Sequence, residues 1–310
     1  MKDIVYVKHQ QRLGLSNGSL RFHNPVTGEE HFMLAEEVGA VIFDAQKSYI
    51  EVAALTKLQA NHVLLFFCDE KHSPTGLLCS EYSYLKKLAV LKKQLSLPKK
   101  TKGRLWRKII MSKIQNQRNL LVFHLGISIH ADREFEALIK EVQEFDSTLR
   151  EAVAAKKYFK LWDQTGFKRG RFSDRVNSSL NYGYAILRSA IRHSFAAHGF
   201  EPSFGIGHES EENPFNLADD LIEPYRPFVD QIILTQILSK SKEIFDQEDR
   251  LLLIEKVLLS ECLLDGKTYH ISDAVARTVE SYLRCLEKGT IGELLLPELI
   301  EPLVLSEGEV

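Results

Sequence analysis

The sequence has 310 residues, of which 44% are hydrophobic and 26% charged, and its formal net charge is −2. This length allows two domains or one elaborated domain, and the composition is ordinary for a soluble globular protein. No apolar run approaches the ~20 residues that span a bilayer, and MKDIVYVKHQ does not resemble a signal peptide. We therefore expect a cytoplasmic protein with no membrane partner.

The cysteines argue against both a zinc site and a disulfide framework. They stand at irregular spacings, and no two form a C-x-x-C pair. We expect all four to be buried thiols: Cys68, Cys79, Cys262 and Cys285.

Residues 1–80 are predicted to form a β domain with one embedded helix. RLGLSNGSLRFHN indicates two strands joined by an Asn-Gly hairpin turn. HFML, VGAVIFD and VLLFFCD indicate further short strands, and PTGLLCS allows one more. The segment SYIEVAALTKLQANH, which lies among them, has helical spacing.

The hydrophobic period changes to 3.6 after Glu81. Residues 81–103 predict an amphipathic helix followed by a basic linker, and residues 104–310 predict an all-α domain. The fold class is therefore α+β, with a small β domain ahead of a larger helical one. The predicted helices begin near Arg104, Asp132, Ser147, Asn177, Phe215, Asp246 and Ser272.

Basic residues are concentrated in two runs. Residues 86–118 contain twelve Lys and Arg and no acid, and residues 156–175 contain seven bases and two acids. Such clusters are typical of proteins that bind polyanions, although a solvated helical face has the same composition. Asn177, Asn181 and Arg188 share one face of a predicted helix and could line a phosphate path. The residues predicted to contact the phosphates of such a polyanion are Lys99, Lys100, Lys102, Arg104, Arg188 and Arg192.

Three polar islands interrupt the apolar helices. Glu151 has Ala155 and Tyr158 on its helical face, His208 lies in a glycine-rich loop, and FNLADDLIEPYRP carries Asp220 and Glu223 one turn apart. One histidine with two or three carboxylates suits Mg²⁺ or Mn²⁺ better than zinc. Each island also has a structural interpretation, since the acids could cap helices and the histidine could be an ordinary loop residue.

One rival site survives comparison with known motifs. The sequence contains no H-E-x-x-H, no phosphate-binding G-x-x-x-x-G-K-[ST] loop and no G-x-S-x-G. DDLIE is of the D-D-x-x-[DE] type with which the all-α isoprenoid synthases hold Mg²⁺-diphosphate. No second aspartate-rich motif follows it, and that fold has no need of a β domain.

LREAVAAKKYF, LNYGYAILRSAIRH and GIGHESEENPFNLADDLIEPYRPFVD, in this order, resemble the CRISPR-associated integrase, the first of the Cas proteins. The likeness extends to VLLFFCDEKHSPTGLL in the β domain and is weakest over the last ~50 residues. The motif N-L-A-D-D-L-[IM]-E-P-[FY]-R-P is specific to this family. Together with FCDEKHSPTG, it is most similar to the proteins of type II systems.

The resemblance implies a β-sandwich-like N-terminal domain that forms a homodimer and a helical catalytic domain. It implies that Glu151, His208 and Glu223 bind Mg²⁺ or Mn²⁺ and are the catalytic residues. Asp220 matches a carboxylate that some members place beside the metal, and we expect it to support the ligands. The implied partners are double-stranded DNA and a small dimeric adaptation protein that completes a heterohexamer. The type II effector nuclease is a further candidate partner.

The sequence therefore predicts a metal-dependent endonuclease and integrase that inserts short DNA duplexes into a CRISPR repeat array. In this reaction a 3′-hydroxyl attacks a phosphodiester. The alternatives are an inactive DNA-binding scaffold of the same fold and a magnesium-dependent isoprenoid synthase. Removing one acid from the predicted site is expected to relieve repulsion and leave the fold intact.

Overall fold

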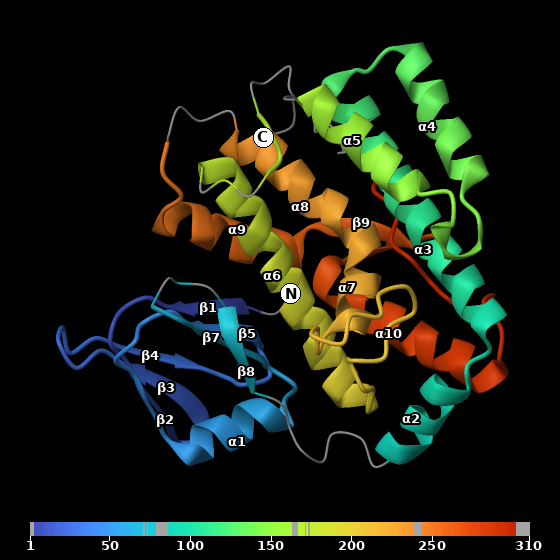
Figure 1. Ribbon diagram of the computed structural model, residues 1–310. Coiled ribbons are helices and arrows are strands. Elements are labelled where there is room, and N and C mark those ends of the chain that lie inside the picture. Colours follow the sequence, from blue (N-terminus) through green and yellow to red (C-terminus); the bar gives the residue numbers. More distant parts are fainter. Residues whose placement is uncertain are drawn as a thin grey trace. The chain divides into compact units, whose positions relative to one another are not determined.

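The computed structural model describes residues 3–70, 72, 74–78, 86–162, 167–170, 172, 174–238 and 243–301. The chain divides into two compact units, residues 1–87 with 192–199, and residues 88–191 with 200–310. Figure 1 shows strands gathered in the first unit and a larger set of helices in the second. The predicted α+β class, with an N-terminal β region and a larger helical part, is confirmed.

The first unit contains two four-stranded sheets and one helix. One sheet has the order β1-β5-β7-β8 and the other β4-β3-β2-β6. Strands β1, β5 and β7 are parallel, and β8 is antiparallel to β7. The elements are β1 (Asp3–Val7), β2 (Arg12–Ser16), β3 (Ser19–His23), β4 (Glu30–Met33), β5 (Val38–Phe43), β6 (Tyr49–Ile50), α1 (Val52–Ala60), β7 (Leu64–Cys68) and β8 (Pro74–Leu78).

The hairpin predicted at Asn17 and Gly18 is confirmed as the turn between β2 and β3. Both residues have positive φ, 50° and 81°, which is the backbone that asparagine and glycine tolerate best. Alternate residues of β3 are buried, and they join one apolar core with residues of the other sheet and of α1. The first unit therefore has a core of its own.

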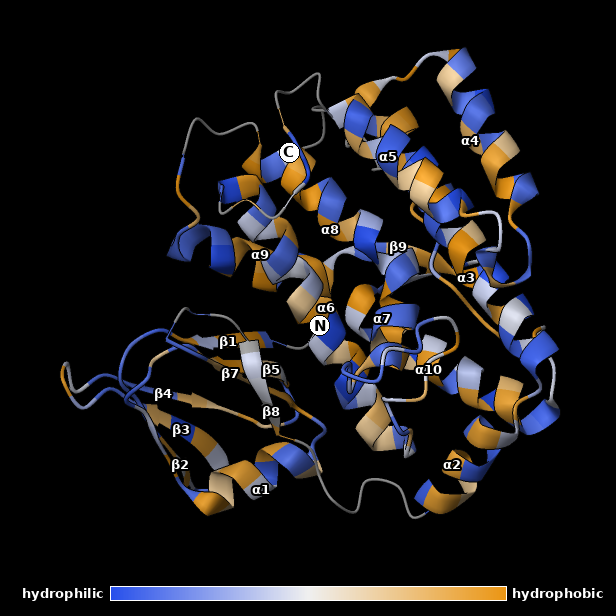
Figure 2. Cartoon of the chain, viewed as in Figure 1, coloured by the Kyte–Doolittle hydropathy of each residue, from blue (hydrophilic) through white to orange (hydrophobic). Residues whose placement is uncertain are grey.

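The second unit is mainly helical. No helix in the described ranges is long and apolar enough to cross a membrane. Figure 2 shows hydrophobic and hydrophilic residues side by side along its long helices. The helices that lie wholly or mostly in this unit are α2 (Lys87–Ser96), α3 (Lys99–Leu120), α4 (Ile129–Glu141), α5 (Arg150–Trp162), α6 (Arg175–His198), α7 (Asn216–Ile222), α8 (Arg226–Ile232), α9 (Gln247–Leu259) and α10 (Ile271–Lys288). Residues 192–198 of α6 group with the first unit. Shorter turns are η1 (Leu121–Leu125), η2 (Glu144–Asp146), η4 (Glu223–Tyr225) and η5 (Ile233–Ile237).

Two sequence predictions about this unit are wrong. The basic linker is short, because α3 begins at Lys99 directly after Pro98; proline is well tolerated at a helix start, where its missing N–H needs no partner. The unit is also not all-α, because β9 (Glu261–Leu264) and β10 (Lys267–His270) form a hairpin. Its turn is Asp265-Gly266, both with positive φ.

Cys68, Cys262 and Cys285 are buried free thiols, as predicted, and Cys79 lies outside the described residues.

Helix α3 is the centre of the second unit. It packs against α4, α5, α7 and α8 and against the turns η2 and η4. Gly103 is required at its N-terminal end, since a β-carbon there would lie 2.6 Å from the Phe145 ring. The helical segment that carries Asp220 and Glu223 has a 3-10 turn in its middle: α7 ends at Ile222, η4 holds Glu223 and Pro224, and α8 follows. The site is therefore built between α3, α5 and the segment from α7 to α8.

Candidate metal and nucleic-acid site

Glu151 and Glu223 meet on one positive charge, the ammonium of Lys113. Glu151 is in the first turn of α5, Glu223 begins η4, and Lys113 is in the middle of α3. Lys113 Nζ lies 2.6 Å from Oε1 of Glu151 and 2.5 Å from Oε2 of Glu223. The fold thus brings two of the predicted ligands, far apart in the sequence, to the same point.

Glu223 is held as an anion between two cations. Its side chain is only 5% exposed, and the Arg226 guanidinium Nε lies 2.9 Å from the carboxylate oxygen that Lys113 does not contact. Burial by itself would raise the pKa of Glu223, but Arg226 and Lys113 together hold that pKa below its ordinary value. Burial likewise opposes the charge of Lys113, yet Glu223 and Glu151 raise its pKa.

The expectation that removing an acid relieves repulsion is wrong for Glu223. Lys113 and Arg226 share this carboxylate, so its removal leaves two largely buried cations undercompensated. Breaking a buried ion pair from one side costs on the order of 3 kcal/mol. Replacing Glu223 therefore weakens the fold as well as the site.

Asn116 fixes the backbone beside Glu223. This buried side chain, one turn after Lys113 on α3, donates to the Pro224 carbonyl at 2.8 Å and to the Pro297 carbonyl at 2.9 Å. Its carbonyl oxygen accepts from the Leu299 amide at 3.0 Å. Successive turns of α3 thus hold the side chain of Glu223 and the backbone that follows it.

Asp220 positions His208. Its fully buried carboxylate accepts hydrogen bonds from the amides of Ile206, Gly207 and His208, and Oδ1 lies 2.7 Å from Nδ1 of the imidazole. A β-carbon at Gly207 would lie 2.3 Å from the Trp106 ring, which itself packs edge-on against the imidazole. The glycine-rich loop is therefore needed for the close approach that fixes the histidine.

The two halves of the site influence each other. The hydrogen bond to Asp220 is the main reason that the pKa of His208 is raised, and the charges of Glu223 and Glu151 raise it further. Burial raises the pKa of Asp220 in spite of its hydrogen bonds from His208 and the loop amides. The imidazole thus lies in the negative field of both glutamates.

The donor set suits a hard divalent cation. Two carboxylates already converge on one positive charge, and the Asp220 contact engages Nδ1 of His208, which leaves Nε2 as the other ring donor. As the side chains stand, no three His, Cys, Asp or Glu residues in the described ranges are grouped closely enough to hold a metal ion. The assignment of Glu151, His208 and Glu223 as ligands stays a prediction.

Sequence reasoning missed Lys113, Arg226 and Asn116. Lys113 belongs to the acid-free run 86–118, so composition alone suggests that it binds phosphate. Nothing in the sequence shows that its face of α3 meets Glu151 and Glu223. Arg226 stands inside the EPYRP motif, three residues after Glu223, and this i, i+3 spacing is a usable signal. Asn116 gives no such signal.

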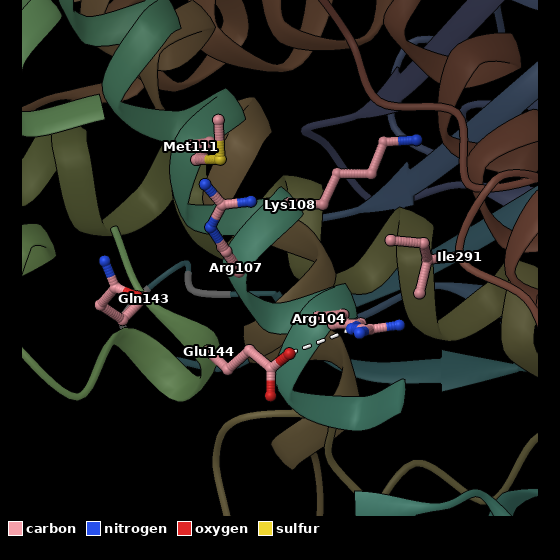
Figure 3. Close-up of a pocket in the computed structure, with 7 residues that line it drawn as sticks. All are labelled: Arg104, Arg107, Lys108, Met111, Gln143, Glu144 and Ile291. Atoms are coloured by element: carbon pink, nitrogen blue, oxygen red, sulfur yellow. Dashed lines mark hydrogen bonds and ion pairs between the residues drawn. The ribbon is translucent and has the colours of Figure 1, made fainter. Parts of the chain in front are cut away.

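Residues 86–118 contain no acid, but acidic side chains from other segments contact some of their arginines. Arg118 lies 2.6 Å from Asp132 and 2.9 Å from Glu136, both on α4. Arg104 contacts Glu144, as Figure 3 shows. Part of the positive charge of α3 is therefore neutralised within the protein, and its electrostatic footprint is smaller than the sequence suggested.

A hollow of about 580 Å³ opens beside the N-terminal half of α3. Figure 3 shows Arg104, Arg107 and Lys108 extending from α3 at its edge. Arg107 Nε donates to the Val142 carbonyl at 2.6 Å, and Lys108 Nζ donates to the Leu294 carbonyl at 2.5 Å. Carbonyl partners leave the positive charges uncancelled, so this hollow is a candidate contact for phosphate groups.

The six predicted DNA-binding residues have different surroundings. Lys99 and Lys100 are exposed, and no acid in the described ranges pairs with either. Lys102 lines a second hollow, which includes His208 and the acidic loop after it. Arg104 is paired as described above, and Arg188 lies 2.6 Å from Asp219. Arg192 groups with the first unit. Contact of all six with DNA stays a prediction.

Comparison with known proteins gives concordant matches. The model of the family "CRISPR associated protein Cas1" matches residues 5–263. A CRISPR-associated endonuclease Cas1 of Neisseria meningitidis is 36% identical over 207 residues, 67% of each chain.

Two solved structures share the fold. A chain of "Casposase bound to integration product" has a TM-score of 0.76 at 17% identity and covers 93% of this chain and 91% of its own. A chain of a "Cas6-RT-Cas1--Cas2 complex" has a TM-score of 0.71 at 16% identity and covers 97% of this chain and 36% of its own. At such low identity these two matches speak for the fold alone. The family match spans most of the chain, and the chain therefore belongs to the Cas1 family of CRISPR-associated proteins.

Proposed function

We propose that this protein is a divalent-metal-dependent DNA endonuclease and integrase that inserts short duplexes into a CRISPR repeat array. Glu151, His208 and Glu223 are the proposed ligands of Mg²⁺ or Mn²⁺. The observation that carries the proposal is the convergence of Glu151 and Glu223 on one buried positive charge, inside the negative field that also acts on His208. The curated relative from N. meningitidis is named an endonuclease, which is consistent with it.

In the proposed reaction the 3′-oxygen of the incoming duplex forms a bond to phosphorus at the repeat boundary. The existing phosphorus–3′-oxygen bond breaks, and the proton lost by the attacking hydroxyl is balanced by one gained at the leaving oxygen. A bound divalent cation supplies stabilisation of negative charge on the phosphate and the leaving oxygen. No external energy source is needed, because one phosphodiester replaces another.

The chain's own residues prepare this chemistry. Asp220 accepts a hydrogen bond from Nδ1 of His208, which favours the tautomer with a lone pair on Nε2. The loop amides that also bind Asp220 prevent the pair from rotating. Arg226 and Lys113 keep Glu223 ionised although it is buried. Lys99, Lys100, Lys102 and Arg104 would neutralise the DNA backbone, together with Arg188 and Arg192.

The isoprenoid synthase alternative does not survive. The chain belongs to the Cas1 family, and the aspartates of DDLIE are already engaged. Asp219 pairs with Arg188 and accepts from Asn213 at 2.7 Å, and Asp220 binds the loop amides. The two carboxylates therefore act on different neighbours and do not form a shared diphosphate site.

The proposed partners follow from the family. We propose a homodimer, formed through the β domain, and a small dimeric adaptation protein that joins two such dimers into a heterohexamer. The Cas6-RT-Cas1–Cas2 complex, one chain of which shares this fold, is by its name an assembly with a second adaptation protein, and this supports the proposal. Association with the type II effector nuclease is the least supported of these proposals.

The test is strand transfer. The protein is incubated with supercoiled repeat-containing plasmid, a short duplex, the small adaptation protein and Mn²⁺ or Mg²⁺. Covalent linkage of the duplex to the plasmid is expected, and it should vanish with EDTA and with Glu223→Gln. If the protein binds DNA tightly but links no duplex to the plasmid with either Mn²⁺ or Mg²⁺, it is an inactive scaffold instead.

A further inference from the structure

Lys113 lies between the carboxylates of Glu151 and Glu223, two of the proposed metal ligands. The residue is 8% exposed, and its ammonium contacts Glu151 and Glu223 at 2.6 and 2.5 Å. Arg226, by contrast, contacts only the other oxygen of Glu223. Of these two cations, Lys113 alone bridges the proposed ligands.

A lysine in this position has a clear role without metal. A largely buried ammonium is unfavourable unless anions surround it, and the carboxylates of the buried Glu223 and the partly exposed Glu151 repel one another unless a cation separates them. The Lys113 bridge meets both requirements at once. It therefore keeps Glu151 and Glu223 close together in the metal-free protein.

The same bridge opposes a divalent cation. An ion bound by Glu151 and Glu223 would compete with the ammonium for the same two carboxylates, and its charge would repel the ammonium. The lysine side chain is a flexible four-carbon stem with a compact charge, so Nζ can move away without unfolding α3. An arginine there would be bulkier and would still carry the charge.

We propose that Lys113 is an intramolecular counter-ion that the catalytic metal must displace, so that it stabilises the metal-free site and weakens metal binding. This inference rests on the proposed function, since it takes Glu151 and Glu223 to be metal ligands. It assigns to Lys113 a positioning role, because the residue acts by holding two ligands together.

The test measures metal binding and stability. Mn²⁺ binding to the full chain is followed by calorimetry and by electron paramagnetic resonance of the free ion, and melting temperature is recorded with EDTA and with saturating Mn²⁺. For Lys113→Met we expect a lower melting temperature in EDTA, at least tenfold tighter Mn²⁺ binding than in the parent, and a larger rise in melting temperature with Mn²⁺.

Two variants serve as controls. Lys108→Met removes a lysine of the same helix whose Nζ contacts a carbonyl and no carboxylate, so Mn²⁺ affinity should stay within about twofold of the parent. Lys113→Arg keeps the competing charge and should bind Mn²⁺ no more tightly than the parent. If Lys113→Met unfolds in EDTA, refolding that requires Mn²⁺ is the expected result, with Lys113→Gln measured beside it.

The outcomes separate the two proposals. Equal Mn²⁺ affinity of Lys113→Met and the parent, with binding lost in Glu223→Gln, would overturn the counter-ion role and leave the metal site standing. If neither the parent nor Lys113→Met binds Mn²⁺, both the metal site and the counter-ion role are overturned. Weaker binding by Lys113→Met would also contradict the proposal, because it would mean that the lysine assists the metal.

Discussion

Two buried carboxylates on the same helical segment, from α7 to α8, have opposite surroundings. Glu223, at the start of η4, is paired with the ammonium of Lys113 and the guanidinium of Arg226. Asp230, two turns later on α8, accepts hydrogen bonds from the hydroxyls of Tyr158 at 2.9 Å and Tyr184 at 2.5 Å. Cations lower the pKa of Glu223, whereas burial raises the pKa of Asp230 to about 6.

The charge state of a buried carboxyl group therefore depends on the groups that contact it. Both carboxylates are nearly inaccessible, and the Arg226 guanidinium between them lies 4.6 Å from the Tyr184 ring centre. Of the two, Glu223 is the one that contacts a lysine ammonium, at 2.5 Å. The two hydroxyl groups around Asp230 hold its carboxyl group in place by hydrogen bonds and carry no charge that would balance its ionised form. These surroundings are consistent with the proposed metal-binding role of Glu223 and with a structural role for Asp230.

The largest expected difference is in strand transfer. Glu223→Gln should abolish covalent linkage of duplex to plasmid, because the amide cannot bind a hard cation as the carboxylate does. Asp230→Asn should retain strand transfer per folded molecule, since Asp230 is not among the proposed ligands. The folded fraction of each variant is measured by circular dichroism, and the rates of strand transfer are compared per folded molecule. Linkage by Glu223→Gln at the parental rate would refute the metal assignment.

Asp220 provides an intermediate case. It is as buried as the other two, but its partners are loop amides and the imidazole of His208. Asp220→Asn should reduce strand transfer by about 10–100-fold, the usual effect of losing a residue that orients a metal ligand. Asp219→Asn, the neighbouring change, should lose less. If Asp220→Asn is as inactive as Glu223→Gln with unchanged stability, Asp220 binds the metal itself.

Paired and unpaired cations of α3 should differ in DNA affinity. Each phosphate contact contributes about −0.9 to the log–log slope of affinity against salt. Replacing Lys99 and Lys100 together with alanine should make the slope shallower by about 1.8 if both make contacts. Arg118→Ala should change it little, because Asp132 and Glu136 already neutralise that charge. Fluorescence anisotropy of a labelled duplex measures both, and equal slopes would refute the distinction.

The sequence predicted the structure best where signals are local. The Asn17-Gly18 hairpin depends on neighbouring residues, and it was predicted correctly. The hairpin at residues 261–270 was missed although Asp265-Gly266 is the same kind of signal. Its strands are short and lie between long helices, so helical periodicity on both sides concealed them.

The candidate site residues were named from the sequence, and their role as metal ligands stays a prediction. Glu151, Glu223 and His208 were named because the motifs of the family mark them, and the structure brings both glutamates to one charge. Lys113 could not be predicted, because the pairing of α3 with α5 and η4 is a tertiary contact with no spacing rule. The same limit applies to Arg118 and Arg188, whose acidic partners come from other helices.

The smallest expected effect, on stability, tests the comparison itself. The pKa of Asp230 is about 6, above its ordinary value, so its contribution is complete at low pH and is lost as pH rises through about 6. The pKa of Glu223 is lowered, so its contribution is complete above its ordinary pKa and is lost only in stronger acid. In EDTA, the stability of the parent relative to Asp230→Asn should therefore fall between about pH 5 and pH 7.5, by on the order of 1 kcal/mol. Over the same interval its stability relative to Glu223→Gln should change less, and only through His208, whose pKa the charge of Glu223 raises. Urea unfolding at several pH values measures both differences. If the stability difference between the parent and Asp230→Asn and that between the parent and Glu223→Gln change with pH in the same way, hydroxyl and cation partners do not distinguish these carboxylates.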